Sequence, residues 1–559
     1  MHASLLLLLA ITTPPQQEPQ ARSLLGKPLS SPAPSQKLLQ RFEEKQSAYK
    51  QNPDSAETLI WYGRFLAYKG DYREAIRLYT LGTKKFPNDA RIFRHRAHRY
   101  ITIRQFDEAI ADMNRAVELI RGKPNEGEPD GMPNAKNIPV STLHGNIYYH
   151  LGLTHYLKGN FPKALNAYRK CLRLKTNDDN TVSATHWVYM ILRRMGRDEE
   201  AREVLNGIRR KMNIVENFSY HKACLFYKGE LPATELRSKQ DATDAPANDA
   251  SRYALANWHL YNGETDKARA AFEAIVAGST WQSFGHIAAE ADLARMRNQQ
   301  VAIETTPDLK IGPVPSGRLD VFKPSFTKYV NVFGVHIFGT RRTPDAKLRH
   351  VAAVMAEYLD NDEDGKVDNK KVVDALVSRD AYMVIAASER DMDRIDPEPF
   401  FDGSFHAGQS QWATETAPAD AFDATLEEVF HLITNHGYAN AYPEVFGTKP
   451  GTKLADCLDA ARGGRFEDVP RRYPRDAWFS YDDDTCEYEC QITEYIYWAM
   501  TSMLGAQKPR WRQREIADEW KLPTRELVKE RDPAVFKLLS DPRYKFPTRL
   551  PDGRYRSEK

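Results

Sequence analysis

The chain has 559 residues, which is too long for one typical domain and predicts two or more domains. Its 79 basic and 76 acidic residues nearly balance, so the formal net charge of +3 provides no electrostatic basis for nucleic-acid binding. The hydrophobic content of 41% predicts ordinary packed domains and excludes wholesale disorder.

An apolar run from Leu5 to Ile11 lies near the N-terminus. It is much shorter than the ~20 residues that cross a bilayer, and it is similar to the core of a secretory signal peptide. We therefore expect export, to the periplasm or out of the cell, with a cytoplasmic location as the alternative. The stretch from Pro14 to Pro34 is rich in Pro, Ser and Gln, so residues 1–50 are expected to be a signal-like segment and a disordered lead-in. No other segment is long and apolar enough to span a membrane.

Residues 51–300 contain internal repeats. The segments Gly70–Ala75 and Gln105–Ala109 share a pattern of aromatic, acidic and small residues, and their alanines lie 34 residues apart. A two-helix unit of this length, with small residues at fixed places, resembles the tetratricopeptide repeat. Related segments begin at Gly159, Gly196 and Gly263, and a degenerate unit occupies residues 214–245. In the first unit the family's expected positions are taken by Gly63, Gly70, Tyr72, Ala75, Tyr79 and Pro87.

The resemblance implies an α-solenoid, in which repeats stack into a superhelix with an extended concave face. The family binds peptides or proteins on that face, so a protein or peptide partner in the groove is expected. The alternative is a spacer that binds nothing and supports the C-terminal domain. Residues 122–140 are rich in Gly, Pro and Asn and predict a loop that interrupts the array.

A change of pattern marks a second domain. Residues 301–318 hold three prolines and two glycines and predict a linker. Residues 328–339 predict a strand, residues 344–360 a helix, and residues 381–387 a second, buried strand. We therefore expect residues 319–559 to form an α+β, mainly helical domain that is independent of the repeats.

A dense acidic segment, residues 360–368, ends the first predicted helix of this domain. Its spacing resembles the calcium loop of the EF-hand, with Gly365 at the sharp turn. Lys371 stands where the family has a bidentate Glu, so the site needs a ligand from elsewhere or binds weakly. The alternative is an acidic surface turn without an ion. The resemblance implies calcium ligands from Asp360, Asp362, Asp364, the backbone carbonyl of Lys366, and Asp368.

The stretch 423–438 predicts one helix with an apolar face. Asp423 or Thr425 can cap its start, and Gly437 can end it. The apolar face follows from the helical spacing of Leu426, Val429, Phe430 and Ile433.

Within this helix, residues 427–431 resemble the active-site helix of zinc metallopeptidases. The family pattern is His-Glu-x-x-His, and Glu427 replaces its first His. The resemblance implies that Glu427 and His431, one turn apart on one face, ligate zinc and that Glu428 is the catalytic base. The alternative assigns Glu428 to a capping box with Thr425, without chemistry.

Glu494 is the candidate third zinc ligand. It is the lone carboxylate of a strongly apolar predicted helix, residues 490–504, and such a carboxylate is rarely buried without a partner. Zinc peptidases of the gluzincin type take a third ligand from a Glu on a later helix, which the resemblance implies for Glu494. An arginine partner is the alternative, and His406 and His436 are fallback ligands.

The five cysteines do not form a dense disulfide framework. If the protein is exported, Cys457, Cys486 and Cys490 are the candidates for one bridge. A metal pair of Cys486 and Cys490 is a weaker alternative, since zinc sites more often use closer pairs.

Two function classes remain open. The first is a metal-dependent hydrolase of the peptidase type, whose repeats recruit protein substrates. The second is a non-catalytic binding protein whose C-terminal domain has the shape of a peptidase without its chemistry. Glu427 in place of a His favours the second class, because carboxylates bind zinc less selectively than imidazole does. The lone Glu494 favours the first.

Overall fold

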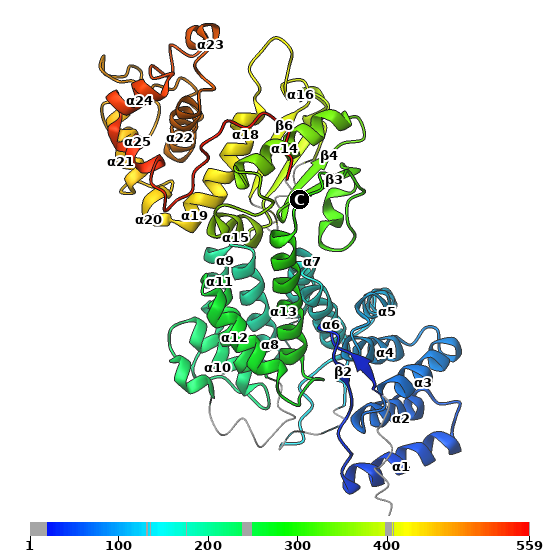
Figure 1. Ribbon diagram of the computed structural model, residues 1–559. Coiled ribbons are helices and arrows are strands. Elements are labelled where there is room, and N and C mark those ends of the chain that lie inside the picture. Colours follow the sequence, from blue (N-terminus) through cyan, green and yellow to red (C-terminus); the bar gives the residue numbers. More distant parts are fainter. Residues whose placement is uncertain are drawn as a thin grey trace, which may run out of the picture. The chain divides into compact units, whose positions relative to one another are not determined.

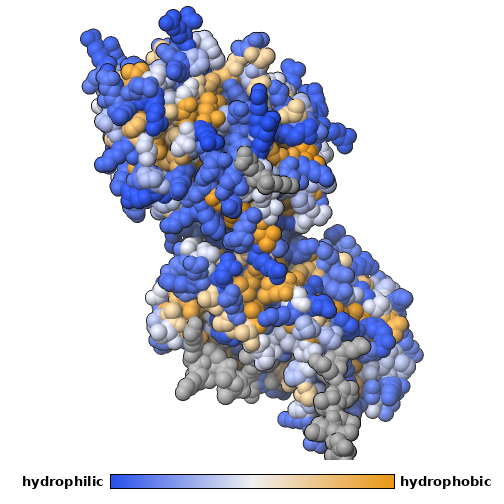
Figure 2. All heavy atoms as spheres, in the orientation of Figure 1, coloured by the Kyte–Doolittle hydropathy of each residue, from blue (hydrophilic) through white to orange (hydrophobic). Residues whose placement is uncertain are grey.

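The structure is a computed structural model that describes residues 19–557 apart from 130, 131, 133, 135, 175, 238–248, 397–404 and 406. The chain divides into two compact units, Met1–Arg295 and Met296–Lys559, which are described separately below. The signal-like run of the N-terminus lies outside the described residues. Figure 2 shows hydrophilic residues over most of the visible face of each unit, with apolar residues gathered in smaller areas.

The first unit is a solenoid of antiparallel helix pairs (Figure 1). α10 (Phe218–Tyr227) and η2 (Ala233–Arg237) occupy the predicted degenerate unit, and α1 (Gln36–Gln51) precedes the first pair. The solenoid and the mixed unit that follows it confirm the predicted fold class. The pairs are α2 (Ala56–Tyr68) with α3 (Tyr72–Lys85), α4 (Ala90–Thr102) with α5 (Phe106–Leu119), α6 (Leu143–Leu157) with α7 (Phe161–Arg173), α8 (Asp178–Arg194) with α9 (Asp198–Val204), and α11 (Ala250–Tyr261) with α12 (Thr265–Val276).

One left-handed residue makes the turn inside each pair. Glycine holds this position in most pairs, with φ of 98° at Gly70 and 78° at Gly159, because glycine adopts positive φ without steric cost. In the second pair Arg104 holds it at φ 67°, which explains why the glycine pattern is missing there. Gly229, at φ 73°, marks the same turn between α10 and η2.

A second glycine in two of the pairs allows the paired helices to approach closely. A Cβ on Gly63 would lie 2.4 Å from the ring of Tyr79, and a Cβ on Gly152 would lie 2.7 Å from the ring of Tyr168. Each tyrosine therefore fills the space that a side chain on the facing helix would take. The same small-and-aromatic spacing in the two pairs is what the sequence repeats predict.

The N-terminal lead-in is ordered from residue 19 onward, contrary to the prediction of disorder. β1 (Ala21–Arg22) and β2 (Pro28–Leu29) form a short antiparallel hairpin, and Ala21 and Leu29 are buried. The Trp281 indole donates a hydrogen bond to the Ser30 carbonyl at 2.9 Å. Burial of these few apolar side chains on the first unit orders a segment whose composition alone predicts a loop.

The first helices of neighbouring pairs pack directly on one another, and we call α2, α4, α6, α8 and α11 the inner layer. Among the described residues, the second helices of neighbouring pairs contact each other less, so the inner layer is the concave side of the solenoid. α13 (Phe284–Glu304) begins in the first unit, and its residues up to Arg295 lie against this layer. The predicted linker therefore begins inside a helix, since residues 301–304 belong to α13.

The second unit is built on a four-stranded sheet of order β3-β4-β5-β6. β3 (Lys328–Val332) and β4 (Val335–Gly339) are antiparallel, while β5 (Tyr382–Ala386) and β6 (Gly408–Trp412) extend the sheet in parallel. The single strand predicted over 328–339 is thus a hairpin. Its turn is Phe333-Gly334, with φ of 49° and 91°. Strand-forming β-branched residues flank this turn on both sides, so the sequence pattern predicts one continuous strand.

Helices cover this sheet and form the rest of the unit (Figure 1). α18 packs against β6, α14 and α22, so it lies at the centre of the core. No helix of the described residues is long and apolar enough to cross a membrane. The helices are η4 (Arg318–Phe322), α14 (Asp345–Leu359), α15 (Lys370–Ser378), α16 (Glu389–Met392), α18 (Thr425–Leu432), η5 (Ile433–Tyr438), α19 (Ala439–Ala441), α20 (Pro443–Phe446), α21 (Lys453–Ala461), α22 (Tyr488–Leu504), α23 (Arg510–Glu515), α24 (Arg525–Arg531) and α25 (Pro533–Leu539).

The close contact of Gly152 with Tyr168 provides a test of the repeat packing. Gly152→Ala forces the ring and the added methyl group apart, so we expect the free energy of unfolding of the chain to fall by about 1–3 kcal/mol. Gly207→Ala is the matched control, because nothing lies within 4 Å of a Cβ added there. Urea unfolding followed by circular dichroism measures both. Equal effects of the two substitutions would contradict the packing.

Candidate metal site

α18 begins at Thr425, and its N-cap residue is Ala424, which makes no side-chain capping bond. Asp423, one residue earlier, accepts a hydrogen bond at Oδ1 from the Thr425 amide at 3.1 Å. The imidazole of His350 pairs with the other oxygen of Asp423 at 2.6 Å. Thr425 makes no capping hydrogen bond, and Glu428 instead accepts a hydrogen bond from the Gln409 amide of β6. The capping-box alternative is therefore wrong, and the Glu428 carboxylate is directed toward the sheet.

The sequence predicts that this helix ends at Gly437, and this prediction is wrong. The helix continues as the π-helix η5 and then as α19, up to Ala441. Gly437 lies inside η5 because α15 packs against it: an added Cβ would lie 2.8 Å from the Val372 side chain. A π-helical turn that begins two residues after His431 is a feature that often accompanies functional sites.

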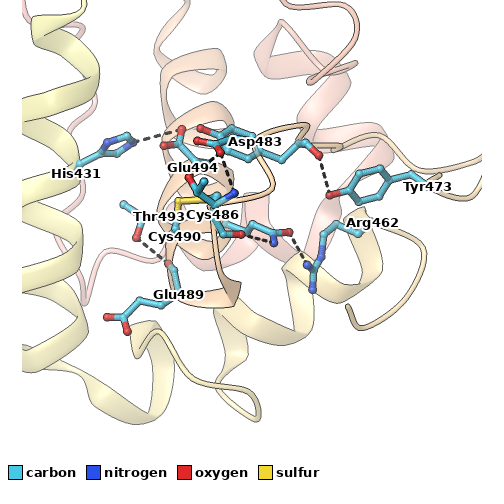
Figure 3. The surroundings of a disulfide bond; sticks show 12 residues. His431, Arg462, Tyr473, Asp483, Cys486, Glu489, Cys490, Thr493 and Glu494 are labelled. Atoms are coloured by element: carbon cyan, nitrogen blue, oxygen red, sulfur yellow. Dashed lines mark hydrogen bonds and ion pairs between the residues drawn. A yellow bond between two sulfur atoms is a disulfide. The ribbon is translucent and has the colours of Figure 1, made fainter. Parts of the chain in front are cut away.

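Glu427, His431 and Glu494 come together between α18 and α22. One potential ligand atom from each lies within 4.8 Å of the others, and His431 Nε2 lies 3.6 Å from Glu494 Oε2. Figure 3 shows His431 and Glu494 directed toward each other, while Glu489 of the same helix points away. His431 and Glu494 are only 8% and 9% exposed, and His431 Nε2 has no hydrogen-bond partner among the described residues.

Burial controls the protonation of the cluster. It raises the pKa of Glu494 well above its ordinary value, and the nearby charges of Glu427 and Glu428 raise it further. Burial raises the pKa of Glu427 and takes the pKa of Glu428 to about 7, although hydrogen bonds from Tyr497 and Gln409 oppose these shifts. Burial lowers the pKa of His431 to about 4, so its imidazole is neutral at pH 7, the form that ligates metals.

Three polar side chains that the sequence analysis missed orient these carboxylates. Tyr497 is hydrogen-bonded to Glu427, Tyr481 to Glu494, and the Gln409 amide to Glu428. Tyr497 lies on α22, three residues after Glu494, and its helical spacing is a signal that was available in the sequence. Gln409 and Tyr481 come from a strand and a loop distant in sequence, where spacing gives no such signal.

Arg512, whose charge acts on Glu427, is not a partner of Glu494. The guanidinium of Arg512 stacks over the rings of Phe422 and Trp498, at 3.9 Å and 5.4 Å, and its Nε donates to Gln507. Its charge lowers the pKa of Glu427 from a distance, but burial outweighs this effect. The arginine alternative for Glu494 is therefore not observed, and within the described residues Glu494 instead contacts His431 and Tyr481.

The donor set fits a divalent metal ion. Two carboxylates and one neutral imidazole match the ligand types of zinc, and an unpartnered buried Nε2 is the atom such an ion would satisfy. Zinc–ligand bonds of about 2.0–2.2 Å require donor atoms within roughly 4 Å of one another. The donor atoms of Glu427, His431 and Glu494 lie within 4.8 Å of one another, which is slightly more than this distance. They therefore have to approach one another by less than about 1 Å when an ion binds.

The other candidate ligands lie elsewhere. His436 is in η5, outside the cluster, and burial lowers its pKa to about 4. His406 lies outside the described residues. Cys486 and Cys490 form a disulfide beside Glu494 at the start of α22, and Cys457 is a buried free thiol (Figure 3).

The acidic segment 360–368 connects α14 to α15 as a helix–loop–helix. Carboxylate oxygens of Asp360, Asp362 and Asp364 lie within 4.8 Å of one another, and Gly365 makes the turn at φ 86°. Asp360 is fully buried and accepts hydrogen bonds from the Gly365 amide at 2.9 Å and from the Tyr555 hydroxyl at 2.6 Å. Burial raises its pKa above the ordinary value.

The predicted calcium ligands Asp368 and Lys366, and Lys371 at the position of the missing Glu, are not arranged as in the calcium loop of the EF-hand. Asp368 accepts a hydrogen bond from the Asn361 amide at 2.7 Å and is not part of the carboxylate cluster. Lys366 donates its amide to Asp364 at 2.8 Å, and its ammonium lies 3.4 Å from the same carboxylate. Lys371, at the position of the missing Glu, lies over the ring of Tyr442 and provides no oxygen.

Comparison with known proteins concerns the repeats. The family model described as tetratricopeptide repeat matches residues 145–178, which contain α7 and most of α6. Over 68 residues the chain is 41% identical to the heat shock protein sti1 homolog of Schizosaccharomyces pombe, and this match covers 12% of the chain and only 12% of that protein. The predicted tetratricopeptide repeats are thus confirmed, while the zincin-like and EF-hand-like features stay predictions.

Solved structures of repeat proteins match the chain only at low similarity. YrrB, described as a TPR protein with an unusual peptide-binding site, is 15% identical, with a TM-score of 0.26 over 46% of this chain and 99% of its own. A tetratricopeptide repeat protein from Parabacteroides merdae is 15% identical, with a TM-score of 0.28 over 46% of this chain and 92% of its own. The TPR domain of P58(IPK) is 13% identical, with a TM-score of 0.14 over 47% of this chain and 95% of its own.

Crowding of buried carboxylates should destabilise the metal-free protein. Glu494→Gln removes one of them, so we expect the free energy of unfolding in the presence of a chelator to rise by about 0.5–2 kcal/mol. Glu489→Gln is the matched control on the same helix, where the side chain is exposed. Urea unfolding followed by tryptophan fluorescence measures the change. A loss of stability in Glu494→Gln, or an equal gain in Glu489→Gln, would show that the cluster is not strained.

Proposed function

We propose that the second unit is a zinc-dependent hydrolase of peptide bonds and that the repeats bind its protein substrate or partner. The observation that carries the proposal is the convergence of Glu427, His431 and Glu494 around a buried, unpartnered imidazole nitrogen. Glu427 and Glu494, the two ends of this set, lie 67 positions apart in the chain, so the fold and not local spacing brings them together. Zinc in such a set polarises the substrate carbonyl and lowers the pKa of a bound water.

The protein's own residues supply the proton transfers. Glu428 follows Glu427 and precedes His431 by three residues on α18, and its elevated pKa of about 7 suits a general base at neutral pH. It takes a proton from the attacking water as the water oxygen bonds to the carbonyl carbon. It then passes this proton to the amine as the carbon–nitrogen bond breaks. The side-chain amide of Gln409 donates to one oxygen of Glu428 and so fixes the position of this carboxylate.

We also propose that the loop of Asp360, Asp362 and Asp364 binds calcium. The support is the helix–loop–helix arrangement, the left-handed Gly365, and three carboxylates close enough to share one hard cation. Asp368 and the Lys366 carbonyl complete the set only if the loop closes around the ion. With no oxygen from Lys371, the expected role is structural and the affinity modest.

Export is proposed as well. The disulfide between Cys486 and Cys490 supports it, because disulfides persist in oxidising compartments. The signal-like run at Leu5–Ile11 is the sequence feature that suggests the route.

The zinc site is tested by separating metal binding from hydrolysis. We expect one zinc per chain by elemental analysis, its loss in His431→Gln, and its retention in the control His436→Gln, which changes the same helical segment outside the cluster. Glu428→Gln should retain zinc and lower the hydrolysis of labelled casein by at least about 100-fold, because the base is lost and no ligand is. Zinc retained by His431→Gln would refute the site. Zinc bound without hydrolysis by the unmodified protein would leave a non-catalytic binding protein.

The calcium loop is tested by thermal unfolding in calcium and in chelator. Calcium at about 100 times its Kd should stabilise the native protein by about 2.7 kcal/mol through mass action, and so raise Tm. Asp362→Asn with Asp364→Asn should abolish the increase. Asp374→Asn should preserve it, since that carboxylate is on α15 and pairs with Lys370 at 2.6 Å. If calcium does not change Tm, the segment is an acidic surface turn that binds no ion.

A further inference from the structure

The first part of α13 is enclosed by the first unit. Every residue from 285 to 293 is buried, which covers more than two helical turns and leaves no face of the helix exposed. A helix that only packs on a surface has an apolar face and a solvated face. Residues 285–293 therefore occupy a groove of the solenoid, as a helical ligand does.

The contacts of this segment fall on the inner layer. The ring of Phe284 lies 5.3 Å from that of His98 on α4 and 5.5 Å from that of His150 on α6. The Arg295 guanidinium donates to the Leu157 carbonyl at the end of α6, at 2.8 Å. In Figure 1, α13 runs alongside α6 and α8.

Two buried carboxylates hold residues 281–295 in place through ion pairs with arginines. Glu290 is paired with the Arg104 guanidinium at 2.7 Å, and both side chains are almost fully buried. Asp292 pairs with Arg194 at the end of α8 at 3.1 Å and accepts a hydrogen bond from Tyr253 of α11 at 2.6 Å. Burial alone would raise the pKa of Asp292, but the adjacent guanidinium groups lower it, so it is charged at pH 7.

The N-terminal segment closes the groove from the other side. The amide of Leu24 donates to Glu290, and the carbonyl of Ser30 accepts from Trp281. Trp281 in turn packs against Tyr72 at 5.4 Å and belongs to the core of the first repeats. The inner layer and residues 20–31 thus surround residues 281–295.

We propose that residues 281–295 are an intramolecular ligand of the solenoid's inner layer, and that a partner reaches this layer only by replacing them. The partner is then a helical protein segment with acidic residues that satisfy Arg104 and Arg194. This inference rests on the proposed partner-binding function of the repeats. It changes the expected state of the groove, which is closed in the resting protein rather than free.

The test uses the full chain and a labelled peptide of residues 281–299. The variant E290Q/D292N weakens the hold on the chain's own segment, while the peptide keeps both acids. The control variant E74Q/D107N removes two carboxylates that form exposed ion pairs on α3 and α5. By fluorescence anisotropy, we expect E290Q/D292N to bind the peptide at least about tenfold more tightly than the unmodified chain and the control.

Hydrogen exchange separates release from unfolding. In E290Q/D292N we expect faster exchange in residues 285–293, with unchanged protection of the outer helices α3 and α5. Peptide binding that is equal in all three proteins, or undetectable in E290Q/D292N, would overturn the proposal. So would loss of protection in α3 and α5 together with α13, since the segment would then be an integral part of the fold. None of these readouts depends on zinc, on hydrolysis or on a natural partner.

Discussion

The second unit depends on how His431 and Glu494 are buried between α18 and α22, beside the partly buried Glu427 and Glu428. Glu427, Glu428 and Glu494 repel one another when ionised, and burial removes the water that would screen them. A fold whose only requirement is stability would carry apolar side chains there. The raised pKa of each carboxyl shows that charge is disfavoured, and the cost is relieved only by protons or by a cation. Strain of this kind, held in place by surrounding structure, is typical of a functional site.

The residues around the cluster also determine whether a proton or a cation can offset the repulsion between the carboxylates. The charge of Arg512 lowers the pKa of Glu427, but its guanidinium stacks on Phe422, donates to Gln507 and pairs with Glu515 at 2.9 Å, so other contacts hold it. The hydrogen-bond donors that reach the cluster, Tyr481, Tyr497 and the Gln409 amide, are neutral and orient single oxygens. These neutral donors do not compensate the negative charge of the carboxylates. This combination of fixed orientation and missing charge is what a metal site requires, because an ion replaces the missing charge without moving the ligands far.

The sequence predicted those features that local spacing controls. Repeat spacing predicted the helix pairs, and the spacing of Glu427 and His431 predicted that they share a helical face. Glu494 was identified from its isolation in an apolar helix, which is a statement about burial. The errors have equally physical causes. The Phe333-Gly334 turn is flanked by strand-forming residues, and Gly437 has its place because α15 packs on it, a tertiary contact that a terminator signal cannot reveal. The ordering of residues 20–31 is likewise a long-range effect.

The concave face shows why a repeat motif alone does not identify a free binding surface. Repeat spacing specifies how helices stack, but a segment far along the chain determines whether the resulting groove is empty. Residues 285–293 are mostly small or apolar, but they include two buried acids, Glu290 and Asp292. Buried acids of this kind demand partners, and Arg104 in the turn after α4 and Arg194 at the end of α8 provide them. Because such pairs are specific in geometry but weak in net stabilisation, they suit a contact that selects its ligand and still permits exchange.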